Sequence, residues 1–182
     1  MKKDVLLLGD PRLRVRSAEV DRFDGVPFDD LAATLHAFRA EKGFGRAISA
    51  PQIGVARRFI AVNLGRGTFF VANPVITWRS DETFTMWDDC MSFPDLLVRV
   101  ARHRSISIDY VDERGAPKRW EELDQAASEL LQHEIDHLDG ILAVDRALDR
   151  DSLVLKGVYD ARREEFDARV QYTIAPVPVS SE

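Results

Sequence analysis

The chain of 182 residues has a single cysteine, so it cannot form an internal disulfide, and this scarcity predicts a reducing compartment. It also lacks a long apolar run. Residues 5–8 give only four apolar positions in a row near the N-terminus, whereas a signal peptide needs about 7–15 and a membrane helix about 20. The net charge of −6 leaves no basic surface for nucleic acid. These absences predict a cytoplasmic protein that binds neither nucleic acid nor membrane.

What is present is an ordinary globular composition, with 45% hydrophobic and 31% charged residues. A chain of this length can bury a core as one domain. No internal repeat or low-complexity segment divides it. We therefore expect one domain over residues 1–182, in which residues 171–182, with Pro176 and Pro178, form an extended C-terminal tail.

The spacing of apolar residues and the turn residues predict three helices and several short strands. A turn is expected at Asp10-Pro11 and a hairpin turn over residues 113–115. The helices are expected over residues 28–42, from 123 or 124 to 138, and 151–170. The strands are expected over residues 58–63, 68–72, 75–78 and 105–111. Strands in the middle of the chain, with helices before and after them, indicate an α+β fold.

The most informative motif is the pentad His-Glu-Ile-Asp-His over residues 133–137. Histidines four residues apart on a helix share one face, so His133 and His137 can bind one metal ion. Glu134 then lies where it can exchange a proton with a metal-bound water. No histidine follows the pentad, so the third ligand must come from elsewhere, and Cys90 is the candidate. The alternatives are a solvated helix face for the pentad and a small buried hydrophobic role for the cysteine.

Three segments, in this order, resemble the signatures of the peptide deformylase family: the loop over residues 43–52, the strip over 88–92 and the helix over 132–140. The family patterns are Gly-x-Gly-φ-Ala-Ala-x-Gln, Glu-Gly-Cys-Leu-Ser and His-Glu-x-x-His. The Asp10-Pro11 turn and Asn73-Pro74 also match, so the resemblance covers most of the chain. It implies one α+β metallohydrolase domain, with mixed or antiparallel sheets around a central metal-binding helix and with N- and C-terminal helices.

The resemblance also implies an activity: removal of the N-formyl group, as formate, from the N-terminal methionine of nascent polypeptides at the ribosome. The metal ligands would be Cys90, His133 and His137. They would hold one divalent ion, Fe²⁺ in the cell, or Zn²⁺, Ni²⁺ or Co²⁺ in preparations. Glu134 would be the general base and acid for attack by the metal-bound hydroxide. The Gln52 side-chain amide and the Met91 backbone N–H would hold the oxyanion.

The departures from the family lie where the substrate would bind. Read back without a gap from Gln52, the loop has Ala47 in place of the second glycine and Arg46 at a usually apolar position. Alternatively, Gly43-Phe44-Gly45 is the glycine pair and two residues are inserted. In the strip, aspartates replace the glutamate and the glycine, and the family's later arginine falls at Leu97, two residues before Arg99. The expected substrate-binding residues are Gly45, Arg46, Ala47, Asp89, Glu129 and Leu130.

Glu129 lies four residues before His133, where the family has an apolar residue that lines the methionine side-chain pocket. Either the helix is slightly rotated and Glu129 is solvated, or Glu129 and Arg46 line the pocket and pair with each other or with a polar substrate. A buried carboxylate without a partner is costly, so a buried Glu129 needs one. The alternative functions are hydrolysis of a more polar N-formyl substrate and a catalytically silent metal- or peptide-binding protein.

Overall fold

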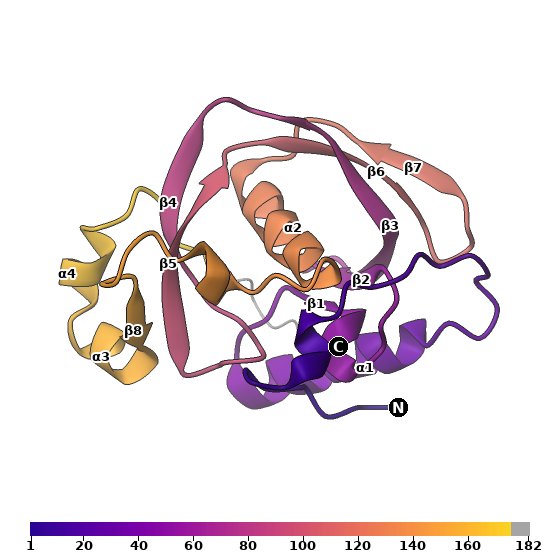
Figure 1. Cartoon of the computed structure of the whole chain (residues 1–182), viewed down its shortest axis with the longest axis horizontal. Helices are drawn as coiled ribbons and strands as arrows, with labels where there is room; N and C mark the ends of the chain where they lie inside the picture. Colours follow the sequence, from indigo (N-terminus) through magenta and orange to yellow (C-terminus); the bar gives the residue numbers. More distant parts are fainter. Residues whose placement is uncertain (176–182) are drawn as a thin grey trace.

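The computed structural model describes residues 1–175 (Figure 1). Along the chain the elements are η1 (Pro11–Arg14), α1 (Phe28–Lys42), β1 (Ala47–Ser49), η2 (Ala50–Ile53), β2 (Phe59–Asn63), β3 (Thr68–Arg79), β4 (Thr83–Asp88), β5 (Leu96–His103), β6 (Ile106–Val111), β7 (Pro117–Trp120), α2 (Gln125–Leu138), η3 (Ala143–Arg146), β8 (Leu153–Leu155), α3 (Lys156–Ala161) and α4 (Arg163–Asp167). None of the helices over these residues is long and apolar enough to cross a membrane.

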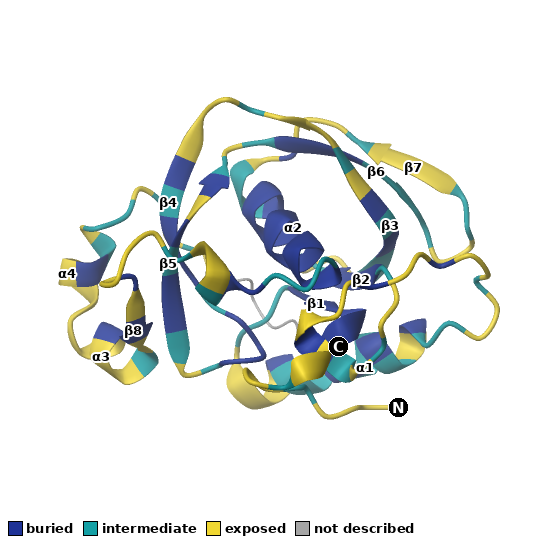
Figure 2. Ribbon diagram, in the orientation of Figure 1, coloured by how far each residue is buried: buried dark blue, intermediate teal, exposed yellow. Residues whose placement is uncertain are grey.

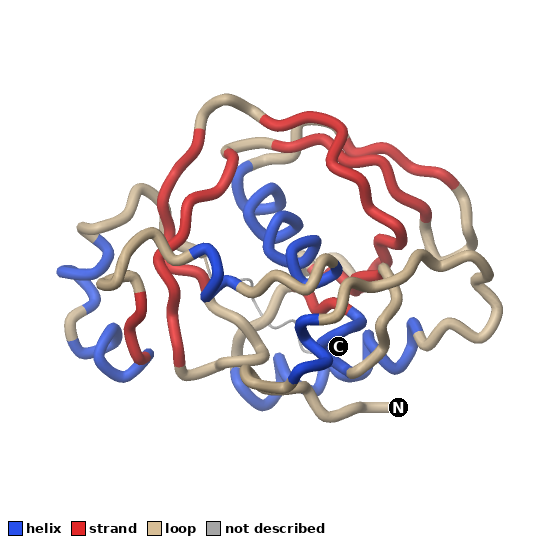
Figure 3. Tube along the Cα trace, viewed as in Figure 1, coloured by secondary structure: helices blue, strands red, loops and turns tan. Residues whose placement is uncertain are grey.

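The strands form two sheets in which every pair of neighbouring strands is antiparallel. The larger sheet has the order β1-β2-β3-β6-β7 and the smaller one has the order β4-β5-β8. The strands curve around α2 and leave it in the middle of the molecule (Figure 3). This arrangement confirms the predicted α+β fold with antiparallel sheets around a central helix.

The two faces of the larger sheet bury different helices, as the two-residue period of a strand requires. On β2, Ile60 and Val62 face the core that holds Leu131 and Ile135 of α2. Phe59 and Ala61, which alternate with them along the strand, face the second core, against α1. The same strand therefore anchors both helices, and α2 is fixed between the two sheets.

Helix α2 is unusual because it is buried on all sides (Figure 2). Every residue from 127 to 138 is buried, including seven with polar or charged side chains: Ser128, Glu129, Gln132, His133, Glu134, Asp136 and His137. Buried polar groups are costly unless they have partners. The polar residues of this helix must therefore be held by other elements, and those contacts build the site described below.

The observed elements confirm part of the sequence prediction. Helix α1 has the predicted bounds, α2 begins one or two residues later than expected, and the predicted hairpin turn joins β6 to β7. The two strands expected over 68–72 and 75–78 are one strand, β3, whose register shifts between Ala72 and Val75. Asn73, between them, has a φ of 49°, so the Asn-Pro pair bends the strand without ending it.

The helix predicted over residues 151–170 is wrong. This segment contains strand β8 and two short helices, α3 and α4. β8 pairs with β5, and its middle residue, Val154, is buried between the exposed Leu153 and Leu155. Arg162, with φ of −135°, separates α3 from α4. Of the expected extended tail, only residues 171–175 lie within the described part of the chain.

Gly140, just after α2, is expected to be intolerant of a side chain. Its φ is +74°, and a Cβ there would lie 2.5 Å from the backbone oxygen of Arg14. Gly43 is a matched control because it follows α1 with a φ of +76° and nothing lies within 4 Å of its Cβ position. We expect Gly43→Ala to cost about 1–2 kcal/mol of unfolding free energy from backbone strain alone. Gly140→Ala should cost clearly more in urea unfolding, and equal losses would contradict the close approach.

Candidate metal centre and catalytic site

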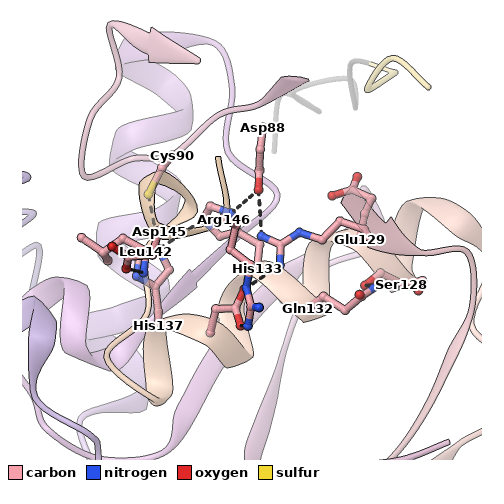
Figure 4. Close-up of polar contacts among 12 residues, drawn as sticks. Asp88, Cys90, Ser128, Glu129, Gln132, His133, His137, Leu142, Asp145 and Arg146 are labelled. Atoms are coloured by element: carbon pink, nitrogen blue, oxygen red, sulfur yellow. Dashed lines mark hydrogen bonds and ion pairs between the residues drawn. The ribbon is translucent and has the colours of Figure 1, made fainter. Parts of the chain in front are cut away.

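Two elements bring the three candidate ligands together. Helix α2 carries His133 and His137 one turn apart, and Cys90 lies in the turn that follows β4. Nε2 of His137 lies 3.1 Å from Nε2 of His133 and 3.3 Å from Sγ of Cys90. All three ligand atoms lie within 4.8 Å of one another, and all three residues are buried. Figure 4 shows the cysteine pointing toward His137.

The two shortest separations, 3.1 and 3.3 Å, are close to those of a metal site. Ligand atoms bonded at ~2.1–2.3 Å with tetrahedral angles lie roughly 3.3–3.7 Å apart. Burial lowers the pKa of His137 well below its usual value, which keeps the imidazole in the neutral form that binds metals. Burial also raises the pKa of the Cys90 thiol, so formation of the thiolate depends on the charge of a bound cation. The Cys/His/His set is therefore suited to one divalent ion.

Asp88 fixes the orientation of His133. Its Oδ2 lies 2.9 Å from Nδ1 of His133 and 2.9 Å from Nη2 of Arg102 (Figure 4 shows the histidine contact). When Nδ1 carries the proton, Nε2 has its lone pair free to bind the metal. Burial would raise the pKa of Asp88, but the charges of His133 and Arg102 outweigh it and hold that pKa well below its usual range. Asp88 is shorter than the glutamate of the family pattern, and the 2.9 Å contact shows that it still reaches His133.

Arg102 is the cation at the centre of this cluster. Besides Asp88, it donates from Nη1 to Oδ2 of Asp136 at 2.5 Å. Its side chain is only 3% exposed. Asp136 also accepts two hydrogen bonds from the partly exposed Arg146, at 2.6 and 2.9 Å. The arginine on β5 thus joins the strip that holds Cys90 to the helix that holds both histidines.

Glu134 lies on α2 beside the ligands and is held by Ser49 of β1. The Ser49 hydroxyl lies 3.0 Å from the backbone oxygen of Glu134 and also contacts the glutamate's carboxylate. Burial raises the pKa of Glu134, against the opposing effects of His133 and Ser49. A carboxylate with a raised pKa can both accept and return a proton near neutral pH, as a general base and acid must.

The side-chain amide of Gln52 is fixed at both ends. Its oxygen accepts a hydrogen bond from Ser49 N at 2.9 Å, within the 3-10 turn η2. Its nitrogen donates to the Ser92 hydroxyl at 3.2 Å and lies 3.6 Å from Sγ of Cys90. The amide N–H groups therefore point toward the candidate metal ligands, which is the direction that an oxyanion donor requires.

These groups face one cavity of about 90 Å³. Its lining includes Gln52, Cys90, His133 and Glu134, together with Met91 and the predicted substrate-binding residues Gly45, Arg46, Ala47, Asp89 and Leu130. Glu129 is buried and is not one of these lining residues, but it forms an ion pair with Arg46, which is. Arg99 lies outside the cavity and pairs with Asp149 at 2.5 Å.

The sequence did not indicate several residues that build the site. Ser49 contacts Glu134 and Ser92 contacts Gln52 directly, whereas Arg102 acts through Asp88, which contacts His133. Ile174 and Ala175, from the C-terminal segment, line the cavity as well. Ser49 stands where the family's loop pattern has its first alanine, but the sequence alone does not reveal its contact with Glu134 on α2.

The site combines three converging candidate ligands with a buried carboxylate and a side-chain amide beside one cavity. This combination is typical of a metal-dependent hydrolase. The two sheets around one buried helix form its scaffold. The comparison with known families makes this class specific. Residues 2–152 match the sequence model of the polypeptide deformylase family, and the chain belongs to that family. The predicted resemblance is confirmed.

Relatives and solved structures agree. A peptide deformylase of Thermotoga maritima is 34% identical over 152 residues, which cover 84% of this chain and 91% of that protein. A peptide deformylase of Heliobacterium modesticaldum is 38% identical over 146 residues, covering 79% and 92%. The crystal structure of the Thermotoga maritima enzyme superposes with a TM-score of 0.74 at 32% identity, covering 82% of this chain and 99% of that one.

Proposed function

We propose that the chain is a peptide deformylase, which hydrolyses the N-formyl group of nascent polypeptides to formate and a free amine. The observation that carries this proposal is the convergence of the ligand atoms of Cys90, His133 and His137 beside a cavity that Cys90, His133, Glu134 and Gln52 line. The general base is intact and buried beside the ligands. A silent binding protein has no need of a carboxylate in that place.

The proposed roles of the side chains follow from their positions. A divalent ion held by the three ligands supplies Lewis acidity and lowers the pKa of water toward ~7. Glu134 accepts the proton of the attacking water and delivers it to the nitrogen of the breaking C–N bond. The Gln52 amide, with the Met91 backbone N–H, holds the negative charge that develops on the formyl oxygen. One such donor contributes about 3–4 kcal/mol to the stability of the transition state.

We propose Fe²⁺ as the cellular metal, with Zn²⁺, Ni²⁺ or Co²⁺ as replacements in preparations, since a thiolate and two imidazoles accept all of these ions. We further propose that residues 1–182 form one metallohydrolase domain and that the enzyme acts in the cytoplasm on chains leaving the ribosome. The single cysteine and the net charge of −6 support the compartment and the absence of direct nucleic-acid binding.

The test is formate release from formyl-peptides by anaerobically purified, iron-loaded protein. Wild-type protein should release formate, and Glu134→Ala should lose at least about 100-fold in kcat because the proton acceptor is gone. Metal analysis of both proteins should give equal metal content, since Glu134 is not a ligand. Metal-loaded wild-type protein that releases no formate from any formyl-peptide would contradict the proposed function.

A further inference from the structure

One wall of the catalytic cavity is an ion pair. The guanidinium of Arg46, which precedes β1, extends to α2, where Nη2 lies 2.5 Å from Oε1 of Glu129. Nη1 of the same group donates to the backbone oxygen of Ala126 at 3.2 Å. The two side chains are only 11% and 2% exposed. Both contacts lie on the turns of α2 that precede His133, so the arginine covers this face of the helix beside the candidate metal ligands.

The pair limits the room beside the scissile bond. A formyl carbon placed for attack must lie near Glu134 and Gln52, so the rest of the substrate must use the remaining cavity. That cavity measures about 90 Å³, whereas ordinary ligand pockets measure about 300–1,000 Å³. An unbranched apolar side chain that enters next to Arg46 would take water from a charged group without replacing its hydrogen bonds, which is costly.

A second charged group faces the same space. Asp89 lines the cavity and is partly exposed to it. Within residues 1–175, no Lys, Arg or His forms an ion pair with its carboxylate. The charge of Arg46 acts on both Asp89 and Glu129, and Arg39 also lines the cavity. Since Glu129 is engaged with Arg46, the oxygens of Asp89 remain as hydrogen-bond acceptors for a bound molecule.

The C-terminal segment lines the same cavity and is anchored on β4. Tyr172 bridges to Met86 of β4, its backbone N–H donates to Thr85 O at 3.1 Å, and its ring packs against Phe84 at 5.3 Å. The phenol lies close enough to the ion pair for Glu129 and Arg46 to influence its ionisation. Two residues further on, Ile174 reaches the cavity. A substrate side chain is therefore confined between an apolar segment and a charged wall.

On the basis of the proposed function, we propose that Arg46, Glu129 and Asp89 are specificity-determining residues. They make this deformylase select N-formyl peptides whose first side chain is short or donates a hydrogen bond, such as serine or glutamine, over those with an unbranched apolar side chain. Arg46 places a charged group where an apolar side chain would have to pack, and Asp89 accepts the hydrogen bond of a polar one. A site built to pair with a polar group rejects an apolar analogue strongly because its own polar groups are left unpaired.

The test compares four peptides, formyl-Xaa-Ala-Ser with Xaa as methionine, norleucine, serine or glutamine, on metal-loaded protein. Wild-type protein should hydrolyse the serine and glutamine peptides with a kcat/KM at least about 10-fold above that of the norleucine peptide. The double variant Arg46→Leu, Glu129→Leu should reverse this order, because its cavity wall is apolar. The variant should fold, since folds often tolerate replacement of a buried ion pair by apolar side chains. Circular dichroism and metal content verify that the variant is folded.

The control is the double variant Asp109→Leu, Arg119→Leu. It removes a bidentate ion pair of 2.6 and 2.9 Å on the exposed β6–β7 ladder, neither member of which lines the catalytic cavity. It should keep the wild-type order of the four peptides. Asp89→Ala should lower kcat/KM for the glutamine peptide relative to that for the serine peptide, since the hydrogen-bond acceptor is gone. It should keep the preference for serine over norleucine, because the arginine remains.

A second readout separates this inference from the proposed function. Calorimetry with metal-loaded Glu134→Ala protein measures binding of the same four peptides without turnover. If wild-type protein prefers methionine and norleucine and the double variant keeps that ratio, the inference is overturned while the deformylase activity stands. If no peptide is hydrolysed, the proposed function fails, and the order of binding affinities decides the inference. Tighter binding of the serine and glutamine peptides supports the inference. Equal or tighter binding of the methionine and norleucine peptides overturns it.

Discussion

Replacing Arg102 with methionine is expected to lower the free energy of unfolding of the metal-free protein by about 3–5 kcal/mol, the typical cost of removing one partner from a buried ion pair. Arg102 is 3% exposed and is bound to both Asp88 and Asp136. Asp136 keeps Arg146 as a partner, but of the ionisable side chains within residues 1–175 Asp88 keeps only His133. The substitution therefore leaves a buried carboxylate whose remaining counter-charge is a metal-ligating imidazole.

The same substitution should weaken metal binding, because an unneutralised Asp88 carboxylate stabilises the protonated form of His133, and a proton taken up from solvent then competes with the metal. Loss of a group that orients a metal ligand typically lowers affinity about 10–100-fold. Urea unfolding of metal-free protein and competition with a chelator measure the two effects separately. The control is Arg104→Met, which removes an exposed ion pair with Glu82 just after the same strand and should change little. Equal effects of the two substitutions would show that the buried cluster has no special role.

The two candidate metal ligands on α2 could be predicted because their geometry is local. Histidines four residues apart share a face on any helix, and an amphipathic pattern was enough to predict the helix. Cys90 followed from the resemblance and from the lack of another candidate, although it meets His137 across 47 residues. Arg102 was not predicted because its partners are set by tertiary packing: Arg102 on β5 meets Asp136 on α2 across 34 residues, and no local period marks that contact.

The charged wall of the cavity was predicted only as one of two alternatives. The sequence placed Glu129 on the ligand face of α2 but could not decide between a solvated and a paired carboxylate. The structure contains the pair, with Arg46 83 residues away. In contrast, strand β8 was not predicted, because the charged segment after residue 150 has helical composition throughout. Its strand β8 exists only because β5 offers an edge for pairing, which is a tertiary effect that residue composition does not contain.

Replacing Cys90 with serine is expected to remove most of the bound metal, because a hydroxyl is a far poorer ligand than a thiolate and only the two histidines remain. Wild-type protein should hold one divalent ion per chain after dialysis, and Cys90→Ser should hold much less than one. Metal that binds only the folded state stabilises it by about 2.7 kcal/mol when its free concentration is 100 times Kd. Adding the metal should therefore raise the Tm of wild-type protein and leave that of Cys90→Ser nearly unchanged.

His36→Ala is the control for adventitious binding to histidine. His36 is exposed, bonds to the Thr68 hydroxyl at 2.6 Å and lies outside the Cys/His/His cluster. It should retain both the wild-type metal content and the metal-dependent rise in Tm. Normal metal content in Cys90→Ser would contradict the assigned centre, since a site that needs no thiolate cannot depend on the turn after β4. Loss of metal in Cys90→Ser alone would assign the third ligand to this cysteine, because the sulfur is the only ligand atom that the substitution changes.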